Sequence, residues 1–352
     1  MFPPCYTFHK PRVSLPLVLC LFCIVVACSP GTRPVETRPQ TESMLVDETI
    51  ITVDGSTLPY RCWLPQKKPV SVVLALHGFN DHANFIQQTA QFLTNQGVAV
   101  YAYDQRGFGA APDHGLWPGQ AVLIDDLKTV VSLLHTRYPG IPLYLLGESM
   151  GGAVVMTALA ASDPPVCQGV ILAAPAVWSR TAMPWSQRFL LAIAAHTMPW
   201  LQVTGRSLNI QASDNTKMLQ DLDRDPLVIK ETRIDALYGL ANLMDAAYDA
   251  AQYFTTPALI LYGEHDDIIP KKPVLHIYQQ LPGTVAGRQR LVLYKNGYHM
   301  LLRDLQADIV RRDITAWLKE PNRPLPSITA ELAVELCRQD SANRDLVPCS
   351  GS

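Results

Sequence analysis

Ser149, Asp266 and His299 are the residues whose types and order along the chain could perform covalent chemistry. A serine hydroxyl becomes a nucleophile when a base removes its proton and a third group orients that base and stabilises its charged form. Histidine and aspartate suit these two roles, and each of the three residues follows a different apolar run. The combination predicts acyl transfer through a covalent intermediate.

Ser149 lies in the pattern Gly-Glu-Ser-Met-Gly, between an apolar run and a segment of small residues. Such a pattern alone is a weak signal, because glycine and serine also fill ordinary turns. Here Gly147 and Gly151 would allow a tight strand-to-helix turn, the nucleophile elbow, which lifts the serine hydroxyl clear of the backbone. We interpret Glu148 as a turn residue or a support for its neighbours, in preference to an acid catalyst.

Acyl transfer also needs hydrogen-bond donors aimed at the oxyanion that develops in the transition state. One expected donor is the backbone N–H of Met150, at the start of the helix that follows Ser149, where the helix dipole assists. The second is expected in the His-Gly-Phe-Asn segment after the strand that ends at Leu76, at the N–H of Phe79. His77 precedes this position, and a structural role is favoured over proton transfer.

The elements that must position these groups alternate between apolar strands and amphipathic helices. After a hairpin around Asp54-Gly55, strands are expected at 71–78, 98–104, 143–149, 169–176, 258–266 and 290–299, and helices at 84–96, 122–138, 151–161, 274–280 and about 310–318. Continuous apolar strands alternating with helices indicate an α/β fold with a doubly wound, mostly parallel, eight-stranded sheet covered on both faces. Ligand sites in such sheets lie at the carboxyl ends of the strands, where the three candidate residues fall.

The segment from Val177 to about Gln252 interrupts this alternation. It lacks strand-like runs and is rich in large apolar side chains, so it is interpreted as a helical cap over the sheet instead of a loop. The apolar residues could be ordinary core packing, but their position in the insertion favours an acyl-chain groove; they are Trp178, Met183, Trp185, Phe189, Leu190, Leu191, Ile193, Met198, Trp200 and Leu201.

The composition is that of one large α/β domain: 352 residues, 48% of them hydrophobic and 17% charged. The formal net charge of −2 gives no indication of nucleic-acid binding. Among Cys62, Cys167, Cys337 and Cys349, no Cys-x-x-Cys pattern or Cys/His cluster predicts a metal site, and no cofactor is expected.

The N-terminus has the pattern of an export signal, with basic Lys10 and Arg12 before an apolar run too short for a comfortable membrane span. Its end, Val25-Val26-Ala27-Cys28, resembles the lipobox of bacterial lipoproteins. Residues 1–27 are therefore expected to be removed, leaving a lipidated Cys28 at the head of a Pro- and Thr-rich tether, 28–45. The alternative is a plain secretory signal with a fortuitous cysteine.

Four further cysteines lie outside the signal and Cys28. Cys62 and Cys167 occupy apolar segments and are expected to be buried thiols. Cys337 and Cys349 lie in the polar C-terminal tail, 321–352, where a disulfide could close a small loop in an exported protein.

Six motifs strengthen the candidate site: HGFNDH at 77–82, YDQRGFG at 103–109, LLGESMGG at 145–152, DRDPL at 223–227, LYGEHDDIIP at 261–270 and NGYHMLLRD at 296–304. In this order, over almost all of the expected domain at 46–320, the chain resembles the monoacylglycerol lipase and lysophospholipase branch of the α/β-hydrolases, a group labelled serine aminopeptidase-like. The resemblance implies Ser149 as nucleophile, Asp266 as orienting acid and His299 as base, with a cap after the sixth strand. Phe79 is bulkier than the residue frequent there in the family, which would narrow the acyl entrance.

Other residues near these motifs have competing interpretations. The spacing of the family's turn favours Asp266 over its neighbour Asp267, which we expect to be solvated or capping. His265 precedes the last strand, whereas His299 follows it. We expect His82 and His114 to be loop residues near the mouth of the site, and Arg106 to hold its loop instead of binding a substrate carboxylate.

Together these features predict a serine hydrolase that cleaves carboxylic esters of single-chain lipids, anchored by lipid in the bacterial cell envelope, with Ser29 after Cys28 pointing to the outer membrane facing the periplasm. A short-chain carboxylesterase or a peptidase on the same scaffold is the nearest alternative. A lipoprotein that keeps the fold only as a scaffold is another. The sequence leaves the oligomeric state open.

Overall fold

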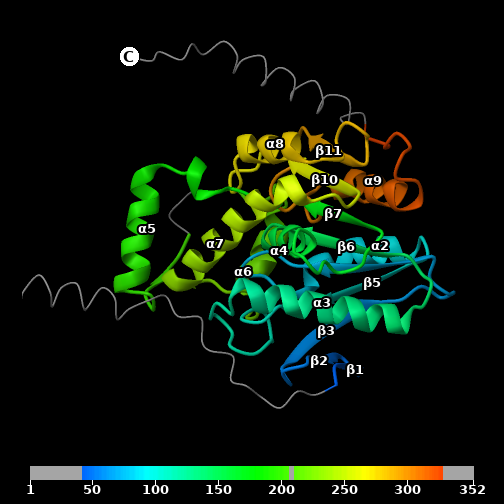
Figure 1. Ribbon diagram of the computed structural model, residues 1–352, viewed down its shortest axis with the longest axis horizontal. Coiled ribbons are helices and arrows are strands. Elements are labelled where there is room, and N and C mark those ends of the chain that lie inside the picture. The colour runs from blue at the N-terminus through cyan, green and yellow to red at the C-terminus, as the bar shows by residue number, and fades with distance from the viewer. Residues whose placement is uncertain (1–41, 206–209, 328–352) are drawn as a thin grey trace, which may run out of the picture.

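The computed structural model describes residues 42–205 and 210–327, which form a central sheet between two layers of helices (Figure 1). The sheet has nine strands in the order β1-β2-β3-β5-β4-β6-β7-β10-β11. Their bounds are β1 Met44–Val46, β2 Thr49–Ile51, β3 Thr57–Trp63, β4 Ser71–Leu76, β5 Val98–Tyr103, β6 Leu143–Glu148, β7 Gly169–Ala173, β10 Ala258–Gly263 and β11 Gln289–Tyr294.

The six strands from β5 to β11 in this order are parallel to one another, while β1, β2 and β3 pair antiparallel at one edge. Every residue of β4, β5, β6, β7 and β10 is buried. Strands buried on both faces need unbroken apolar sequence, which explains why these runs do not alternate with polar residues. The predicted mostly parallel α/β fold is confirmed.

Helices cover both faces of the sheet (Figure 1). One apolar core lies beneath α3 (Gln120–Arg137), α4 (Met150–Leu159), α7 (Ile234–Ala250) and α8 (Lys271–Gln280). The other lies beneath α2 (Gln87–Thr94) and α9 (Ala307–Lys319), with a short 3₁₀ turn, η1 (Ala83–Ile86), leading into α2.

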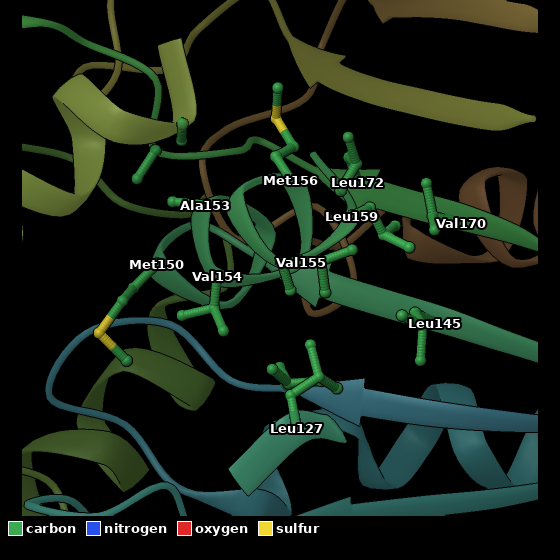
Figure 2. Close-up of a cluster of buried hydrophobic side chains, with 14 of the residues drawn as sticks. Leu127, Leu145, Met150, Ala153, Val154, Val155, Met156, Leu159, Val170 and Leu172 are labelled. Atoms are coloured by element: carbon green, nitrogen blue, oxygen red, sulfur yellow. The ribbon is translucent and has the colours of Figure 1, made fainter. Parts of the chain in front are cut away.

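Helix α4 is the most enclosed of these elements and directly follows Ser149. Figure 2 shows its apolar side chains between β6, β7 and α3, among them Met150, Val154 and Leu159. All but one of its ten residues are buried, so the helix is held from every side. The nucleophile elbow is therefore anchored to a rigid element.

The strand count corrects one prediction. We expected eight strands and a tether reaching residue 45, but β1 (Met44–Val46) pairs with β2 and adds a ninth strand at the edge. This three-residue strand has an exposed, intermediate, exposed burial pattern. Its apolar run is only three residues long, too short to predict a strand, and pairing with β2 together with the packing of Leu45 on the main core holds it in place.

The predicted insertion, 177–252, divides into several elements: α5 (Trp185–Thr197), β8 (Gln202–Val203), α6 (Thr216–Arg224), β9 (Thr232–Arg233), α7, and the 3₁₀ turns η2 (Arg180–Ala182) and η4 (Ala251–Tyr253). The expectation of no strands here was wrong, because β8 and β9 form a two-stranded antiparallel ribbon. Such short strands leave no alternating pattern. Helix α7 packs on the main core beside α4, so only the earlier part of the insertion stands apart as a cap (Figure 1).

The apolar residues of the insertion do not form one cluster. Trp178, Met183 and Leu191 pack against the main core. In contrast, the side chains of Trp185, Phe189, Leu190 and Ile193 on α5 are 74, 61, 69 and 44% exposed.

Of the cysteines, the structure describes Cys62 and Cys167 as free thiols. The prediction of burial was wrong for Cys62, which shares a strand face with buried Leu58 and Tyr60 but reaches solvent near the end of β3; Cys167 is half-buried. The predicted signal, Cys28, most of the tether, and Cys337 and Cys349 lie outside the described residues. Within the described ranges, no helix has the length and apolar character needed to cross a bilayer.

Candidate active site

Ser149 occupies a strained turn between β6 and α4. Its φ of 52° lies in the left-handed region that non-glycine residues seldom adopt. Its N–H donates to Ala173 O at 2.9 Å, and its own carbonyl accepts from Ala176 N at 3.0 Å, so β7 holds the turn in place. Strain of this kind persists where surrounding structure enforces it, and it is typical of functional sites.

The two glycines of the elbow are needed for close backbone approach. A Cβ at Gly147 would overlap the backbone of Gly151 and Gly152, and a Cβ at Gly151 would overlap the carbonyl of Leu76 at the end of β4. Neither glycine has a positive φ, so packing explains both positions. The elbow is thus pressed against the central strand of the sheet.

His299 and Asp266 form a hydrogen-bonded pair. His299 Nδ1 lies 2.8 Å from Asp266 Oδ2, and both side chains are buried. The other carboxylate oxygen of Asp266 accepts from the N–H groups of Ile268 at 2.8 Å and Ile269 at 2.9 Å. With Nδ1 engaged, Nε2 is the nitrogen left to exchange a proton with a substrate or a serine.

The sheet brings the three residues together at the carboxyl ends of its parallel strands. Ser149, Asp266 and His299 follow β6, β10 and β11, and these strands lie in the order β6-β7-β10-β11. Within the described residues no hydrogen bond joins Ser149 to His299. Catalytic hydrogen bonds of this kind are often long before substrate binds.

The segments that carry the two expected oxyanion donors both adjoin Ser149. A Cβ built on Gly78 would lie 3.4 Å from the Ser149 Cβ, so the oxyanion loop, residues 77–82, touches the elbow. The N–H of Phe79 makes no hydrogen bond to another described residue. Met150 is the first residue of α4, where an N–H has no intrahelical acceptor. The Phe79 ring packs edge-on against Phe108, with centroids 5.5 Å apart.

His77 has a structural position, as the sequence favoured. It is fully buried, its Nδ1 lies 2.7 Å from Gly78 O, and its Nε2 accepts from Gln105 N at 3.0 Å. Burial lowers the pKa of this imidazole. Nε2 thus joins the oxyanion loop to the loop after β5, while Nδ1 is engaged within the oxyanion loop.

Arg303 is a residue that the sequence analysis did not single out, and it connects several parts of the site. Its Nη1 lies 2.7 Å from Asp81 Oδ2 and its Nη2 lies 2.8 Å from Glu148 Oε1. All three side chains are buried. Glu148 is therefore a support for the elbow, and the available signal was the position of Arg303 in the NGYHMLLRD motif.

The insertion also holds the oxyanion loop through hydrogen bonds. Asn80 Nδ2 donates to Thr232 Oγ1 at 2.6 Å, and Asn80 O accepts from Ile229 N at 3.0 Å. His82 Nε2 lies 3.0 Å from Asp225 Oδ2. His82 lies in a loop, as expected, and is buried in this contact.

Residues 211–215 of the insertion bond to the base loop, residues 295–305, through several hydrogen bonds. Met300 N donates to Ala212 O at 3.0 Å, and Ser213 Oγ donates to Asp304 Oδ1 at 2.6 Å. The second Asp304 oxygen accepts from Tyr298 N at 2.8 Å, directly before His299. Burial raises the pKa of Asp304 to about 6.

The other candidate residues from the sequence make contacts that do not involve Ser149 or His299. Asp267 is exposed and accepts from Gln211 N at 3.3 Å, while exposed His265 stacks on Tyr298. His114 Nδ1 lies 2.7 Å from Gly109 O. Arg106 bridges Asp54 and Asp126 and so holds its loop. Over the described ranges, no three His, Cys, Asp or Glu side chains are grouped as metal ligands.

Comparison with known proteins agrees with this geometry. Residues 67–306 match the family described as Serine aminopeptidase, S33. The chain belongs to this family. Among its relatives, the monoglyceride lipase of Rattus norvegicus is 27% identical over 76% of this chain and 89% of its own. The monoacylglycerol lipase of Mycolicibacterium smegmatis is also 27% identical, over 76% of this chain and 94% of its own.

A solved structure gives the same fold. A soluble variant of monoglyceride lipase from Saccharomyces cerevisiae, in complex with a substrate analogue, superposes with a TM-score of 0.67. It is 20% identical and covers 84% of this chain and 100% of its own. The α/β-hydrolase architecture predicted from the motifs is confirmed.

Proposed function

We propose that this protein is a serine hydrolase that cleaves carboxylic esters of single-chain lipids through an acyl-enzyme. The observation that carries the proposal is the strained Ser149 elbow at the same sheet edge as the buried His299–Asp266 pair. A serine held in this way, beside a base that an acid orients, is the arrangement that activates a hydroxyl.

In the first half of the reaction, Ser149 Oγ attacks the ester carbonyl carbon while His299 Nε2 takes the hydroxyl proton. The carbonyl oxygen becomes an oxyanion that accepts from the Phe79 and Met150 N–H groups. The tetrahedral intermediate collapses, the bond to the leaving oxygen breaks, and His299 gives its proton to the departing alcohol. Asp266 stabilises the charged imidazole throughout.

In the second half, water attacks the acyl-enzyme carbonyl and His299 Nε2 takes a proton from it. Collapse of the second tetrahedral intermediate breaks the bond to Ser149 Oγ, which recovers its proton from His299. A carboxylic acid is released. The steps balance with water as the sole co-reactant, so no cofactor is needed.

Single-chain lipids are the substrate class that the insertion supports best. The α5 face of Trp185, Phe189, Leu190 and Ile193 is large, apolar and exposed, and such faces mark contacts with other apolar matter. The named lipases among the relatives point the same way. Monoacylglycerols and lysophospholipids are the candidates.

Fatty-acid release by the full chain tests this function, with monoolein, lysophosphatidylcholine and aryl esters of two to sixteen carbons as substrates. We expect turnover of the long single-chain lipids, abolished in Ser149→Ala and kept in Ser179→Ala, a buried serine that bonds Asp245 instead. Turnover of short esters alone would indicate a carboxylesterase in place of a lipase. Release of N-terminal residues from peptides would indicate a peptidase. No turnover would favour a scaffold.

We propose further that Cys28 carries lipid and anchors the protein in the cell envelope, at the outer membrane facing the periplasm. The proposal rests on the Val25-Val26-Ala27-Cys28 sequence and the charged, Pro-rich segment after it. Metabolic labelling with an alkyne fatty acid should mark the wild type but not Cys28→Ser. A labelled Cys28→Ser protein would contradict the lipobox interpretation.

A further inference from the structure

Arg303 pairs with Asp81 and Glu148 in a buried cluster that joins three segments far apart in the sequence. Asp81 belongs to the oxyanion loop after β4, Glu148 is the last residue of β6, directly before Ser149, and Arg303 belongs to the base loop after β11. The guanidinium also lies over the Phe85 ring, 5.9 Å from its centroid. Its two terminal nitrogens thus fix two carboxylates from different segments at once.

Each of the two carboxylates lies close in sequence to one of the expected oxyanion donors. Asp81 is two residues after Phe79, whose N–H is one oxyanion donor. Glu148 is directly before Ser149 and two residues before Met150, whose N–H is the other. Arg303 therefore spans the gap between the two chain segments that carry the donors.

The three charged groups of this cluster are buried, so each depends on the others for compensation of its charge. Burial raises the pKa of Glu148 in spite of Arg303, whereas at Asp81 the effect of burial is outweighed by Arg303 and His77, which lower the pKa. Within the described residues, Glu148 Oε2 has no hydrogen-bond partner, so Arg303 fixes the position of this side chain. Removing one member of a buried ion cluster leaves its partners without compensation.

We propose that Arg303 is a positioning residue for the oxyanion hole: by holding Asp81 and Glu148 together, it sets the spacing between the Phe79 and Met150 N–H groups. The inference rests on the proposed hydrolase function. It assigns Arg303 a part in stabilising the transition state without contact with the substrate.

The test compares Arg303→Met with the wild-type full chain on one soluble aryl ester and one transition-state analogue, an alkyl trifluoromethyl ketone. A spacing error of the order of 1 Å should lower kcat about 10- to 100-fold and change KM by less than about threefold. The inhibition constant of the ketone should rise by the same factor as kcat/KM falls. Arg303→Lys, which keeps the charge but not the fork, should recover part of both.

Arg106→Met is the matched control. Arg106 also bridges two carboxylates, Asp54 and Asp126, with a nearly buried side chain, but these tie the N-terminal hairpin to α3 and not the donors. We expect it to lower the melting temperature while kcat and the ketone inhibition constant of the folded fraction stay within about twofold.

Equal effects of the two arginine variants on kcat, or a fall in kcat with no change in ketone binding, would overturn the proposal. If Arg303→Met does not fold, Asp81→Asn provides the test. This substitution keeps the shape of the side chain, and it should weaken kcat/KM and ketone binding by the same factor. Ser149→Ala separates this failure from failure of the function itself: a wild type no faster than Ser149→Ala would reject the hydrolase, whatever Arg303 does.

Discussion

Helices α5 and α6 belong to the same insertion, yet they relate to the rest of the molecule in opposite ways. Helix α5 exposes four large apolar side chains and packs mainly against α7 (Figure 1). The segments that flank α6 instead make hydrogen bonds, with the base loop from residues 211–215 and with the oxyanion loop from residues 225–232. One part of the insertion supports the catalytic loops, and the other presents an apolar surface.

This difference shows why an insertion cannot be interpreted from its apolar content alone. Directional hydrogen bonds can hold a loop to within a fraction of an ångström, whereas exposed apolar area is non-directional and can be covered by a lipid aggregate or an acyl chain. We therefore assign positioning to the α6 flanks and substrate contact to α5.

The largest effect should come from Asp266 and not from its neighbour. Both aspartates follow β10, but Asp266 holds His299 while Asp267 accepts one bond from the α6 flank. Asp266→Asn should lower kcat about 10³- to 10⁴-fold, because the imidazole loses its orientation and its counter-charge. Asp267→Asn should stay within about threefold. Steady-state kinetics on an aryl ester measures both effects. Equal losses of kcat in the two variants would contradict the assignment of Asp266 as the orienting acid.

The apolar face of α5 should give the next largest effect. Replacing Phe189 and Leu190 together by Ser removes two exposed apolar groups, each worth about 1.5–3 kcal/mol when buried. Turnover of monoolein in vesicles should fall about 10-fold or more. Val285→Ser, a fully exposed apolar residue on a loop far from α5 in sequence, is the control. Equal turnover of monoolein in vesicles by the wild type and the double variant would contradict the assignment of lipid contact to α5.

Asp304, on the α6 side, should give a stability that depends on pH. Its pKa is raised to about 6 by burial, with Asp214 and Glu148 adding to the effect, so the folded state binds the proton more tightly than the unfolded state. Stability from this group is full below about pH 4 and is lost as pH rises through 6. Relative to Asp304→Asn, the wild type should gain about 1–2 kcal/mol on acidification from pH 7 to 4.5, allowing for solvent screening.

Urea unfolding at the two pH values measures this difference. Asn can still accept from Tyr298 N and donate to Ser213 Oγ, so the variant should fold. A constant difference between the proteins across this pH range would show that Asp304 does not titrate there.

The smallest effect is expected at Thr232, which holds the oxyanion loop through Asn80. Thr232→Val removes a hydrogen bond worth about 1 kcal/mol and should lower kcat/KM roughly fivefold. Thr315→Val is the control, since Thr315 is equally buried but bonds Arg311 O on α9. Indistinguishable kinetics of the two variants would break the link between the insertion and the oxyanion loop.

The sequence predicted the fold class well because the information is local. Unbroken apolar runs such as those of β4 and β6 indicate strands buried on both faces, and the glycine-flanked Ser149 indicates the turn between β6 and α4. Chain order then places Asp266 and His299 after later strands. Their roles remain predictions, while the structure adds the contact between them.

What the sequence could not give is non-local. Arg303 meets Glu148 and Asp81, which lie 155 and 222 positions earlier in the chain, and no periodic pattern marks such a pair. The edge strand β1 and the exposure of Cys62 were missed because neither depends on a buried apolar face. The distinction between α5 and α6 is likewise visible only in three dimensions.

Covalent labelling tests the central claim most directly. The full-length wild type is incubated with a long-chain alkyl fluorophosphonate, and the modified peptide is located by mass spectrometry. We predict one phosphonyl group per chain on Ser149, absent in Ser149→Ala and much slower to form in His299→Ala. An unmodified protein, or a label on another serine, would contradict Ser149 as the nucleophile.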